Sequence, residues 1–139
     1  MTQARHDVAE RLHRVAIRLL RTLRAEDRAL GLTPARASVL SILVFGGPRT
    51  LTQLTEAEQV AAPTMTKLIA GLERDGFTRR TAGEDGRIWV IHATARAKRT
   101  MMRGKEKRVA MLLSLLDDAS PAEWATLSSA VSSLEKHLT

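Results

Sequence analysis

The chain has 139 residues, a net charge of +7 and no cysteine. This length suits one domain with its own hydrophobic core. The lack of cysteine excludes disulfides, a thiol nucleophile and thiolate-bound zinc. No apolar run reaches the roughly 18 residues of a membrane span, and the N-terminus lacks a signal-peptide core. We therefore expect a cytoplasmic protein that does not enter a membrane.

The positive charge is concentrated in one third of the chain. Twelve basic and five acidic residues lie between Val60 and Arg108, while the rest of the chain holds equal numbers of each. Such a concentration favours a polyanionic partner such as nucleic acid, because each neutralised phosphate releases counterions. The alternative is a solvated basic face that only keeps the protein in solution.

The first predicted element is an amphipathic helix within residues 1–30. Its apolar positions recur every three or four residues, and arginines occupy the opposite side. This helix is too long for one small core to cover, so we expect its apolar side to meet a second chain. A membrane-surface helix is the alternative, but the apolar side lacks tryptophan and phenylalanine.

Residues 33–92 predict a winged helix-turn-helix. A helix begins at Thr33 and Pro34, and two short motif helices follow at about 51–58 and 62–75, joined by a tight turn. β-prone residues flank a turn-rich loop within 77–92, which predicts a two-stranded wing. The predicted fold class is thus mainly α with a small β-hairpin wing.

Two more helices are expected after the wing, a long connecting helix at 94–116 and a final helix within 117–139. Ser120 and Glu123 have the spacing of a capping box at the start of the final helix. Its apolar face is expected to pair with the first helix of the same chain or of a partner. The residues expected at this dimerisation module are Val8, Leu12, Val15, Leu19, Trp124, Leu127, Val131, Leu134 and Leu138.

The second motif helix is the candidate recognition helix, whose first turns would enter the major groove of DNA. Met65 should face the core, while Arg87 in the wing should reach the adjacent minor groove. Asp85 is expected to bond loop amides or to orient Arg87. The candidate DNA-binding residues are Thr52, Gln53, Pro63, Thr64, Thr66, Lys67, Arg74, Arg79, Arg80, Asp85 and Arg87. The alternative for Arg74 is a surface ion pair with a neighbouring acid.

At these residues the sequence resembles the MarR-type (multiple-antibiotic-resistance regulator) winged-helix transcription factors. The resemblance rests on Leu51–Leu54, on Pro63–Ile69, on Leu72–Phe77, on the wing residues Asp85–Arg87, and on Thr94 before the long helix. It covers nearly the whole chain, so residues 1–139 would form a single MarR-type domain, with dimerisation helices at 1–30 and 117–139.

The resemblance implies a homodimer that binds a roughly palindromic operator in double-stranded DNA and represses more often than it activates. A small, often aromatic, effector would bind in a cleft lined by the first, second and fifth helices. Its binding would release the protein from DNA. The chain departs from the family pattern at Gln59, where a glycine is usual, and at Ala61 and Ala62, where a polar cap is common.

Other chemistry is not indicated by the sequence. We expect no cofactor, no metal site and no enzyme activity, because none of the four histidines is spaced for a metal site with another ligand on a shared helical face, and no phosphate-binding loop or nucleophile motif is present. Two other functions stay open at this stage. One is a ligand-independent architectural DNA-binding protein, and the other is a protein-interaction or membrane-surface module.

Overall fold

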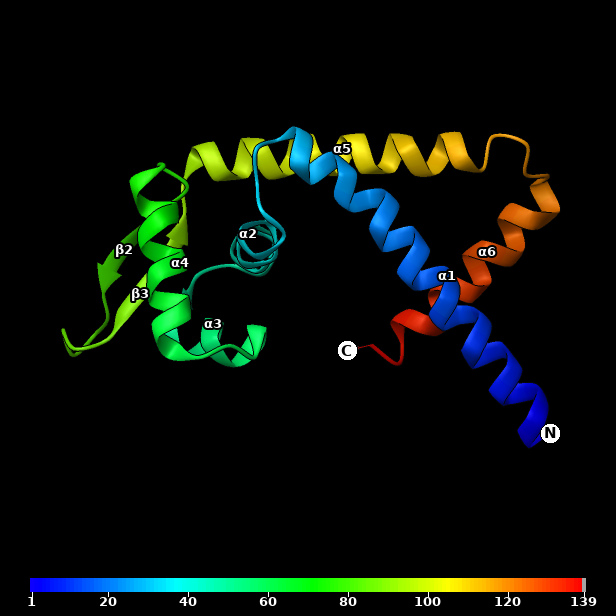
Figure 1. The fold of residues 1–139 in the computed structure, drawn as a ribbon, viewed down its shortest axis with the longest axis horizontal. Coiled ribbons are helices and arrows are strands. Elements are labelled where there is room, and N and C mark those ends of the chain that lie inside the picture. Colours follow the sequence, from blue (N-terminus) through cyan, green and yellow to red (C-terminus); the bar gives the residue numbers. More distant parts are fainter. Residues whose placement is uncertain (139) are drawn as a thin grey trace. The chain divides into compact units, whose positions relative to one another are not determined.

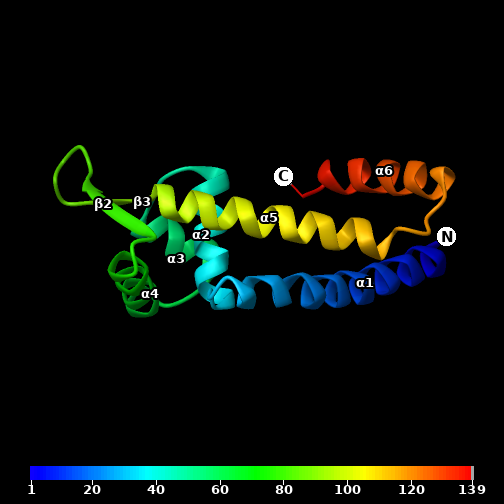
Figure 2. The same ribbon diagram turned by 90° about the horizontal axis from the view of Figure 1, so that it is seen from above.

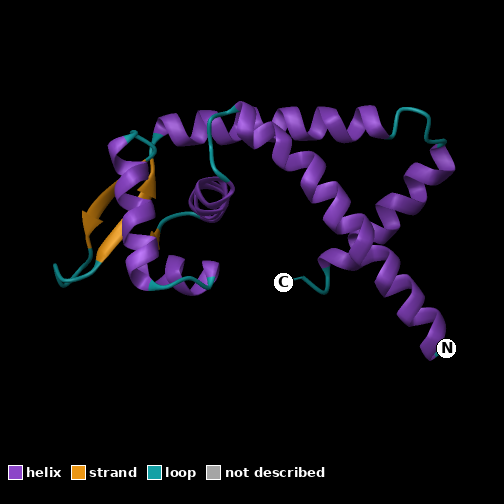
Figure 3. Ribbon diagram, in the orientation of Figure 1, coloured by secondary structure: helices purple, strands orange, loops and turns teal. Residues whose placement is uncertain are grey.

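The computed structural model describes residues 1–138 and confirms the predicted fold class, with six helices and a small antiparallel sheet (Figures 1 and 3). Residue 139, the last of the predicted final helix, lies outside the described residues. Met1–Arg108 and Val109–Thr139 form two compact units. The elements are α1 (Thr2–Ala29), α2 (Pro34–Gly46), β1 (Arg49–Thr50), α3 (Leu51–Glu58), α4 (Ala62–Arg74), β2 (Thr78–Ala82), β3 (Trp89–Ala93), α5 (Ala95–Leu115) and α6 (Pro121–Glu135).

Side-chain caps fix the starts of α2 and α3. The Thr33 hydroxyl accepts a hydrogen bond from the backbone N–H of Arg36, as the sequence predicts. Thr50 and Gln53 form a reciprocal capping box at the start of α3. These bonds satisfy backbone donors that have no partner inside the helix, so each helix begins at a defined residue.

The sheet has three strands in the order β1-β3-β2. β2 and β3 form the predicted wing hairpin, with Thr78 paired to Ala93 and Ala82 paired to Trp89. The loop between them projects away from the helices of its unit (Figure 2). β1 pairs with the inner strand through Arg49 and Ile91. It was not predicted, because a strand of two residues has no periodicity to detect.

The hydrophobic core lies where α2, α3, α4, β3 and α5 meet. Met65 and Leu72 on α4 are fully buried, which confirms the predicted core face of that helix, and Leu68 packs against the core at its edge. Burial of one side of α4 leaves the other side free at the surface. The buried apolar residues are Leu32, Ala37, Val39, Leu40, Leu43, Leu54, Met65, Ile69, Leu72, Phe77, Ile91, Ala97 and Met101.

The two outer helices bury no residue completely. α1 contains no buried side chain, and neither does α6. The predicted capping box of Ser120 and Glu123 is present, and its hydrogen bonds lower the pKa of the Glu123 carboxyl. α6 ends at Glu135, so the prediction that Leu138 continues its apolar face is wrong. The last turn of a helix has backbone carbonyls without partners inside the helix, and such turns commonly fray.

Within residues 1–138, no single helix is long and apolar enough to cross a membrane. The pair of α1 and α2 meets the length and composition criteria only together, across a bend of 90°. α2 contributes four buried residues to the core of the winged helix.

The turn of the helix-turn-helix depends on Gln59. Its backbone has φ 54° and ψ 43°, the left-handed conformation, and among residues 1–138 it is the one residue other than glycine with positive φ. Glu58, just before it, accepts a hydrogen bond of 2.7 Å from the Ser38 hydroxyl and links α3 to α2. Gln59 therefore takes a left-handed conformation at a steric cost that a glycine at this position would avoid.

Replacing Gln59 by glycine should stabilise the protein. Relief of the left-handed strain is worth about 1 kcal/mol in the free energy of unfolding, which corresponds to roughly 3 °C in Tm. Thermal unfolding at one fixed protein concentration measures the effect. Q59A retains the Cβ atom and is the control, with no expected gain. An equal Tm for Q59G and Q59A would contradict the assignment of strain to this turn.

Candidate nucleic-acid interface

α4 presents one continuous exposed face. Its exposed residues are Ala62, Pro63, Thr64, Thr66, Lys67, Ala70 and Arg74, and its buried residues are Met65, Ile69, Gly71 and Leu72. At 100° per residue the exposed positions fall on one arc, opposite Met65, Ile69 and Leu72, and the buried Gly71 lies within that arc. All five predicted contact residues of this helix therefore share the solvent-exposed side. Ala61 stands at the N-cap and gives no side-chain hydrogen bond.

The exposed face of α4 is bordered by a hollow on each side. A groove of about 480 Å³ toward α2 includes Thr64, Lys67 and Arg74 in its lining. A cavity of about 230 Å³ toward the wing includes Thr66 and Arg87. Thr64 and Thr66 thus flank the same face on opposite edges, and Thr66 is the threonine that lies on the wing side.

Two of the predicted polar contacts also serve the local fold. The side-chain oxygen of Gln53 accepts a hydrogen bond from the backbone N–H of Thr50, as part of the α3 cap. The Thr66 hydroxyl donates to the carbonyl of Ala62 at 3.0 Å. The methyl group and the oxygen acceptor of Thr66 therefore stay available for a ligand. Thr52 on α3 is exposed and lines the same cavity as Thr66.

The wing loop is ordered by Asp85. Its carboxylate accepts a hydrogen bond of 3.0 Å from the backbone N–H of Arg87, which confirms the expectation that Asp85 bonds a loop amide. Gly86 between them has φ 71°, a conformation that suits glycine. The side chain of Arg87 is left exposed at the tip of the hairpin. The presence of an acid in this basic hairpin is thus explained by its bond to the backbone.

Arg80 ties the wing to the end of α4. Its Nε and Nη2 atoms donate to the two carboxylate oxygens of Glu73, at 2.7 and 3.0 Å. The hydrogen bond to Glu73 raises the pKa of Arg80 above its ordinary value. Its guanidinium also lies 5.5 Å from the ring centre of Trp89. Arg79 and Arg80 are both exposed, and Arg80 is the one that these contacts hold in place.

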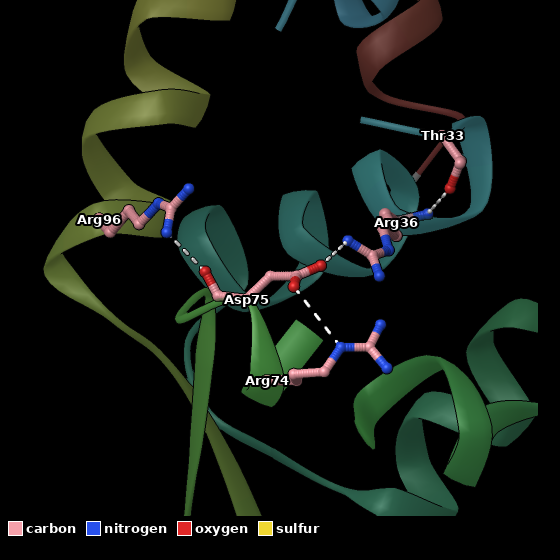
Figure 4. Close-up of polar contacts among 5 residues, drawn as sticks. All are labelled: Thr33, Arg36, Arg74, Asp75 and Arg96. Carbon is pink, nitrogen blue, oxygen red and sulfur yellow. Dashed lines mark hydrogen bonds and ion pairs between the residues drawn. The ribbon is translucent and has the colours of Figure 1, made fainter. Parts of the chain in front are cut away.

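A cluster at the end of α4 was not found from the sequence (Figure 4). The Asp75 carboxylate forms an ion pair of 2.6 Å with Nη1 of Arg36, on α2, and a longer one of 3.6 Å with Nε of Arg74. The carbonyl of Asp75 accepts a hydrogen bond of 2.6 Å from Arg96 on α5. Asp75 thus connects α2, α4 and α5 at the end of α4. Arg74 forms a surface ion pair with a neighbouring acid, which the sequence indicates as the alternative to a DNA contact.

The histidine spacing needs one correction. His6, Asp7 and Glu10 on α1 bring their potential ligand atoms within 4.8 Å of one another, so the expectation that no histidine shares a helical face with another ligand is wrong. Positions four apart lie on the same side of a helix, which explains the approach of His6 and Glu10. All three side chains are exposed, and the three helical neighbours by themselves indicate no function.

Sequence comparisons connect these features to known regulators. The family model described as MarR family matches residues 32–89. The uncharacterized HTH-type transcriptional regulator YpoP of Bacillus subtilis is 31% identical over 100 residues, which are 71% of this chain and 71% of that protein. The residues that the family model matches include α3 and α4. The relative is described as an HTH-type (helix-turn-helix) regulator.

Solved structures share the fold over nearly the whole chain. A MarR family protein from Bacillus stearothermophilus is 22% identical, with a TM-score of 0.87 over 99% of this chain and 97% of that one. A MepR variant of Staphylococcus aureus bound to an oligodeoxyribonucleotide is 16% identical, with a TM-score of 0.71 over 95% and 98% of the two chains. At these identities the likeness shows a common fold.

The Asp75 cluster gives stability a pH dependence. The hydrogen bond from Arg36 is the largest effect and lowers the pKa of Asp75 below its ordinary value. Desolvation opposes it, and the charges of Arg36 and Arg74 add to the lowering. A carboxyl with a lowered pKa stabilises the fold above its ordinary pKa, and this stabilisation is lost as the pH falls through the lowered value. Wild type should therefore have a higher Tm than D75N at neutral pH, and the difference should shrink below about pH 4.

Thermal unfolding of both proteins between neutral and acidic pH tests this dependence. Thr33→Ala is the control, because it removes an uncharged cap of α2 and its effect on Tm should not vary with pH. A D75N effect that stays constant with pH would mean that Asp75 stabilises the fold by its shape and not by its charge.

Proposed function

The chain belongs to the MarR family of HTH-type transcriptional regulators, and we propose that it acts as a dimeric repressor that binds a pseudo-palindromic operator and is released by a small aromatic ligand. It is a winged helix-turn-helix protein of a DNA-binding regulator family. The observation that carries the proposal is the exposed face of α4, which has Lys67 and Arg74 along it and the wing residue Arg87 on its border.

The proposed docking places α4 in the major groove and the wing tip in the neighbouring minor groove. Lys67 and the two threonines of α4 face outward, where hydroxyl, methyl and ammonium groups can reach base edges or phosphates. Arg87 stands on a loop that Asp85 stiffens, which reduces the entropy lost when the arginine binds. The narrow minor groove has a strong negative potential that attracts such an arginine.

The proposed dimer uses the apolar rows of α1 and α6. Val8 and Val15 on α1 are 61% and 57% exposed, and Val131 on α6 is 50% exposed. Leu12, Leu19, Trp124, Leu127 and Leu134 are also exposed in the single chain. Rows of exposed aliphatic side chains on two helices are typical of surfaces that a second chain covers. A twofold dimer would present two α4 helices to the two halves of an operator.

A cavity fits the proposed effector. It has a volume of about 280 Å³ and is lined by residues of α1, α2 and α5, including Leu23, Ser41 and Met101. That volume is close to the lower limit of common ligand pockets and suits a molecule built on one aromatic ring. Asp27 and Arg108 form an ion pair of 2.5 Å on its border, so a polar ligand group could compete for either side chain.

Binding to operator DNA at several salt concentrations tests the wing. R87A should weaken binding and lower the slope of log affinity against log salt by about 0.9 for each phosphate that the arginine no longer neutralises, and thus by up to about 1.8 in a dimer. K136A is the control, because it removes one positive charge outside the winged helix. An R87A protein with the affinity and slope of wild type would contradict the wing assignment.

The same titration tests ligand release. Benzoate, a single-ring aromatic acid, should lower the affinity of wild type for its operator if the effector is of the proposed class. If a panel of small aromatic acids leaves the affinity unchanged while operator binding is sequence-specific, ligand release is excluded and the DNA-binding part of the proposal stands.

The dimer has its own test. V131D places a charge in the apolar row of α6, where burial against a second chain would be costly, so the protein should sediment as a monomer at concentrations where wild type is a dimer. S129D places the same charge on the opposite side of α6 and is the control. A monomeric wild type, or a V131D protein that still dimerises like S129D, would contradict this interface.

A further inference from the structure

We propose that Arg36, a residue of α2 outside the helix-turn-helix, contacts a DNA phosphate, and that Asp75 is the positioning residue that holds its guanidinium beside α4. The proposal rests on the proposed insertion of α4 into the major groove. It adds a contact from a helix that is not part of the motif, together with the acid that makes this contact possible.

The position of Arg36 at the edge of the recognition face follows from two contacts. Its Nη1 atom is 2.6 Å from Oδ2 of Asp75, although the two residues are 39 positions apart in the sequence. Its Nη2 atom lies 2.8 Å from the point that a Cβ atom on Gly71 would occupy. Gly71 is buried even though its neighbours Ala70 and Arg74 are exposed. The guanidinium of Arg36 therefore lies across Gly71, directly next to the exposed arc of α4.

Arg36 has donors left for a ligand. Within residues 1–138, Nη1 makes its hydrogen bond to Asp75, and no protein acceptor is found for Nε or Nη2. The side chain is 20% exposed and lines the groove of about 480 Å³ together with Lys67 and Arg74. A guanidinium has five N–H donors in a planar fork that suits phosphate, so one held by a carboxylate can still bind an oxyanion.

The surroundings of the groove favour a phosphate backbone over a neutral ligand. Three cations, Arg36, Lys67 and Arg74, lie along it, and Glu58 is the acid in its lining. Glu58 already accepts a hydrogen bond from Ser38. Lys67 and Arg74 are two turns apart on α4, about 10 Å along the helix. Arg36 extends this positive row from α4 onto α2.

The wing side of α4 shows the same construction. There Arg80 is held by Glu73 through two hydrogen bonds, just as Arg36 is held by Asp75 on the other side. Each edge of the exposed face thus carries an arginine that an acid at the C-terminal end of α4 keeps in one place. An arginine that is already ordered loses less side-chain entropy when it binds.

Arg96 provides a matched control within the same cluster. It donates to the backbone carbonyl of Asp75 at 2.6 Å, and its guanidinium lies 4.6 Å from the ring centre of Phe77. Figure 4 shows Arg96 on the side of Asp75 opposite to Arg36 and Arg74. Removing Arg96 takes away the same charge from the same cluster but not from the groove beside α4.

The first experiment measures the affinity of the full-length protein for duplex DNA, with an operator selected by wild type, as a function of salt. R36M/D75N removes Arg36 without leaving its acid unpaired, and it should lower the salt slope by about 0.9 for each subunit. R36K retains the charge and should retain most of the slope, and R96M should leave the slope unchanged. An R36M/D75N slope equal to that of wild type would overturn the proposal.

The second experiment displaces Arg36 without changing any charge. G71A places a methyl group 2.8 Å from Nη2 of Arg36, too close for the guanidinium to keep its position, and alanine is the better helix former. We expect a Tm equal to or above that of wild type and a loss of operator affinity of about tenfold. In an R36A background, G71A should have no further effect on affinity. A purely structural role of Arg36 predicts instead that affinity follows stability, and a G71A protein with unchanged affinity would overturn the proposal.

Failure of this inference can be told apart from failure of the proposed function. If wild type shows no salt-dependent binding to duplex DNA, the proposed function fails and Arg36 has no phosphate to contact. If wild type binds and R87A reduces the salt slope, but R36M/D75N and G71A behave as wild type, then the proposed function stands and the role of Arg36 is wrong.

Discussion

The structure depends on how α4 is packed. Met65, Ile69 and Leu72 are almost fully buried and fix the rotation of the helix about its own axis. The opposite face must then point outward, and it is the face that carries Lys67, Arg74 and the threonines. Loss of one of these large apolar side chains would cost about 2–5 kcal/mol and would also release the rotation on which the polar face depends. The packing of α4 and the exposure of its polar face are therefore two consequences of a single helical pattern.

Three of the five acids in the basic third of the chain have a structural role. Glu73 holds Arg80, Asp75 holds Arg36, and Asp85 bonds the backbone of the wing loop. Each of these acids fixes the position of a cation or of the loop that carries one. Exposed ion pairs add little to stability, so positioning is the larger effect of these contacts. Two arginines beside α4, Arg36 and Arg80, are thus held in fixed positions.

Local patterns predicted most of the fold. The caps at Thr33, Thr50 and Ser120 are set by residues three positions apart, and the core face of α4 follows from helical periodicity. The two wing strands were recognised from their β-prone residues, within two residues of the observed ends. The unusual Gln59 was found at the position that needs a left-handed turn. For the caps, the core face of α4 and the strands, neighbouring residues determine the conformation, whereas position 59 was singled out by the family resemblance.

Contacts between distant residues could not be predicted. β1 exists because Arg49 and Thr50 pair with β3, and Arg36 meets Asp75 across 39 residues. The sequence places Arg36 on the first turn of α2, but nothing in that helix indicates which surface it reaches. The same limit applies to Arg80, whose partner Glu73 is known only once the wing is folded against α4. Pairings of this kind depend on the tertiary fold, so local periodicity carries no signal for them.

The central claim is that two copies of α4 read a symmetric DNA sequence. Selection of bound duplexes from a random DNA pool by the full-length protein tests it most directly. The account predicts enrichment of an inverted repeat whose half-sites are about one helical turn apart, or a multiple of it. Recovery of duplexes without any shared or symmetric sequence would contradict the claim and would favour an architectural DNA-binding protein instead.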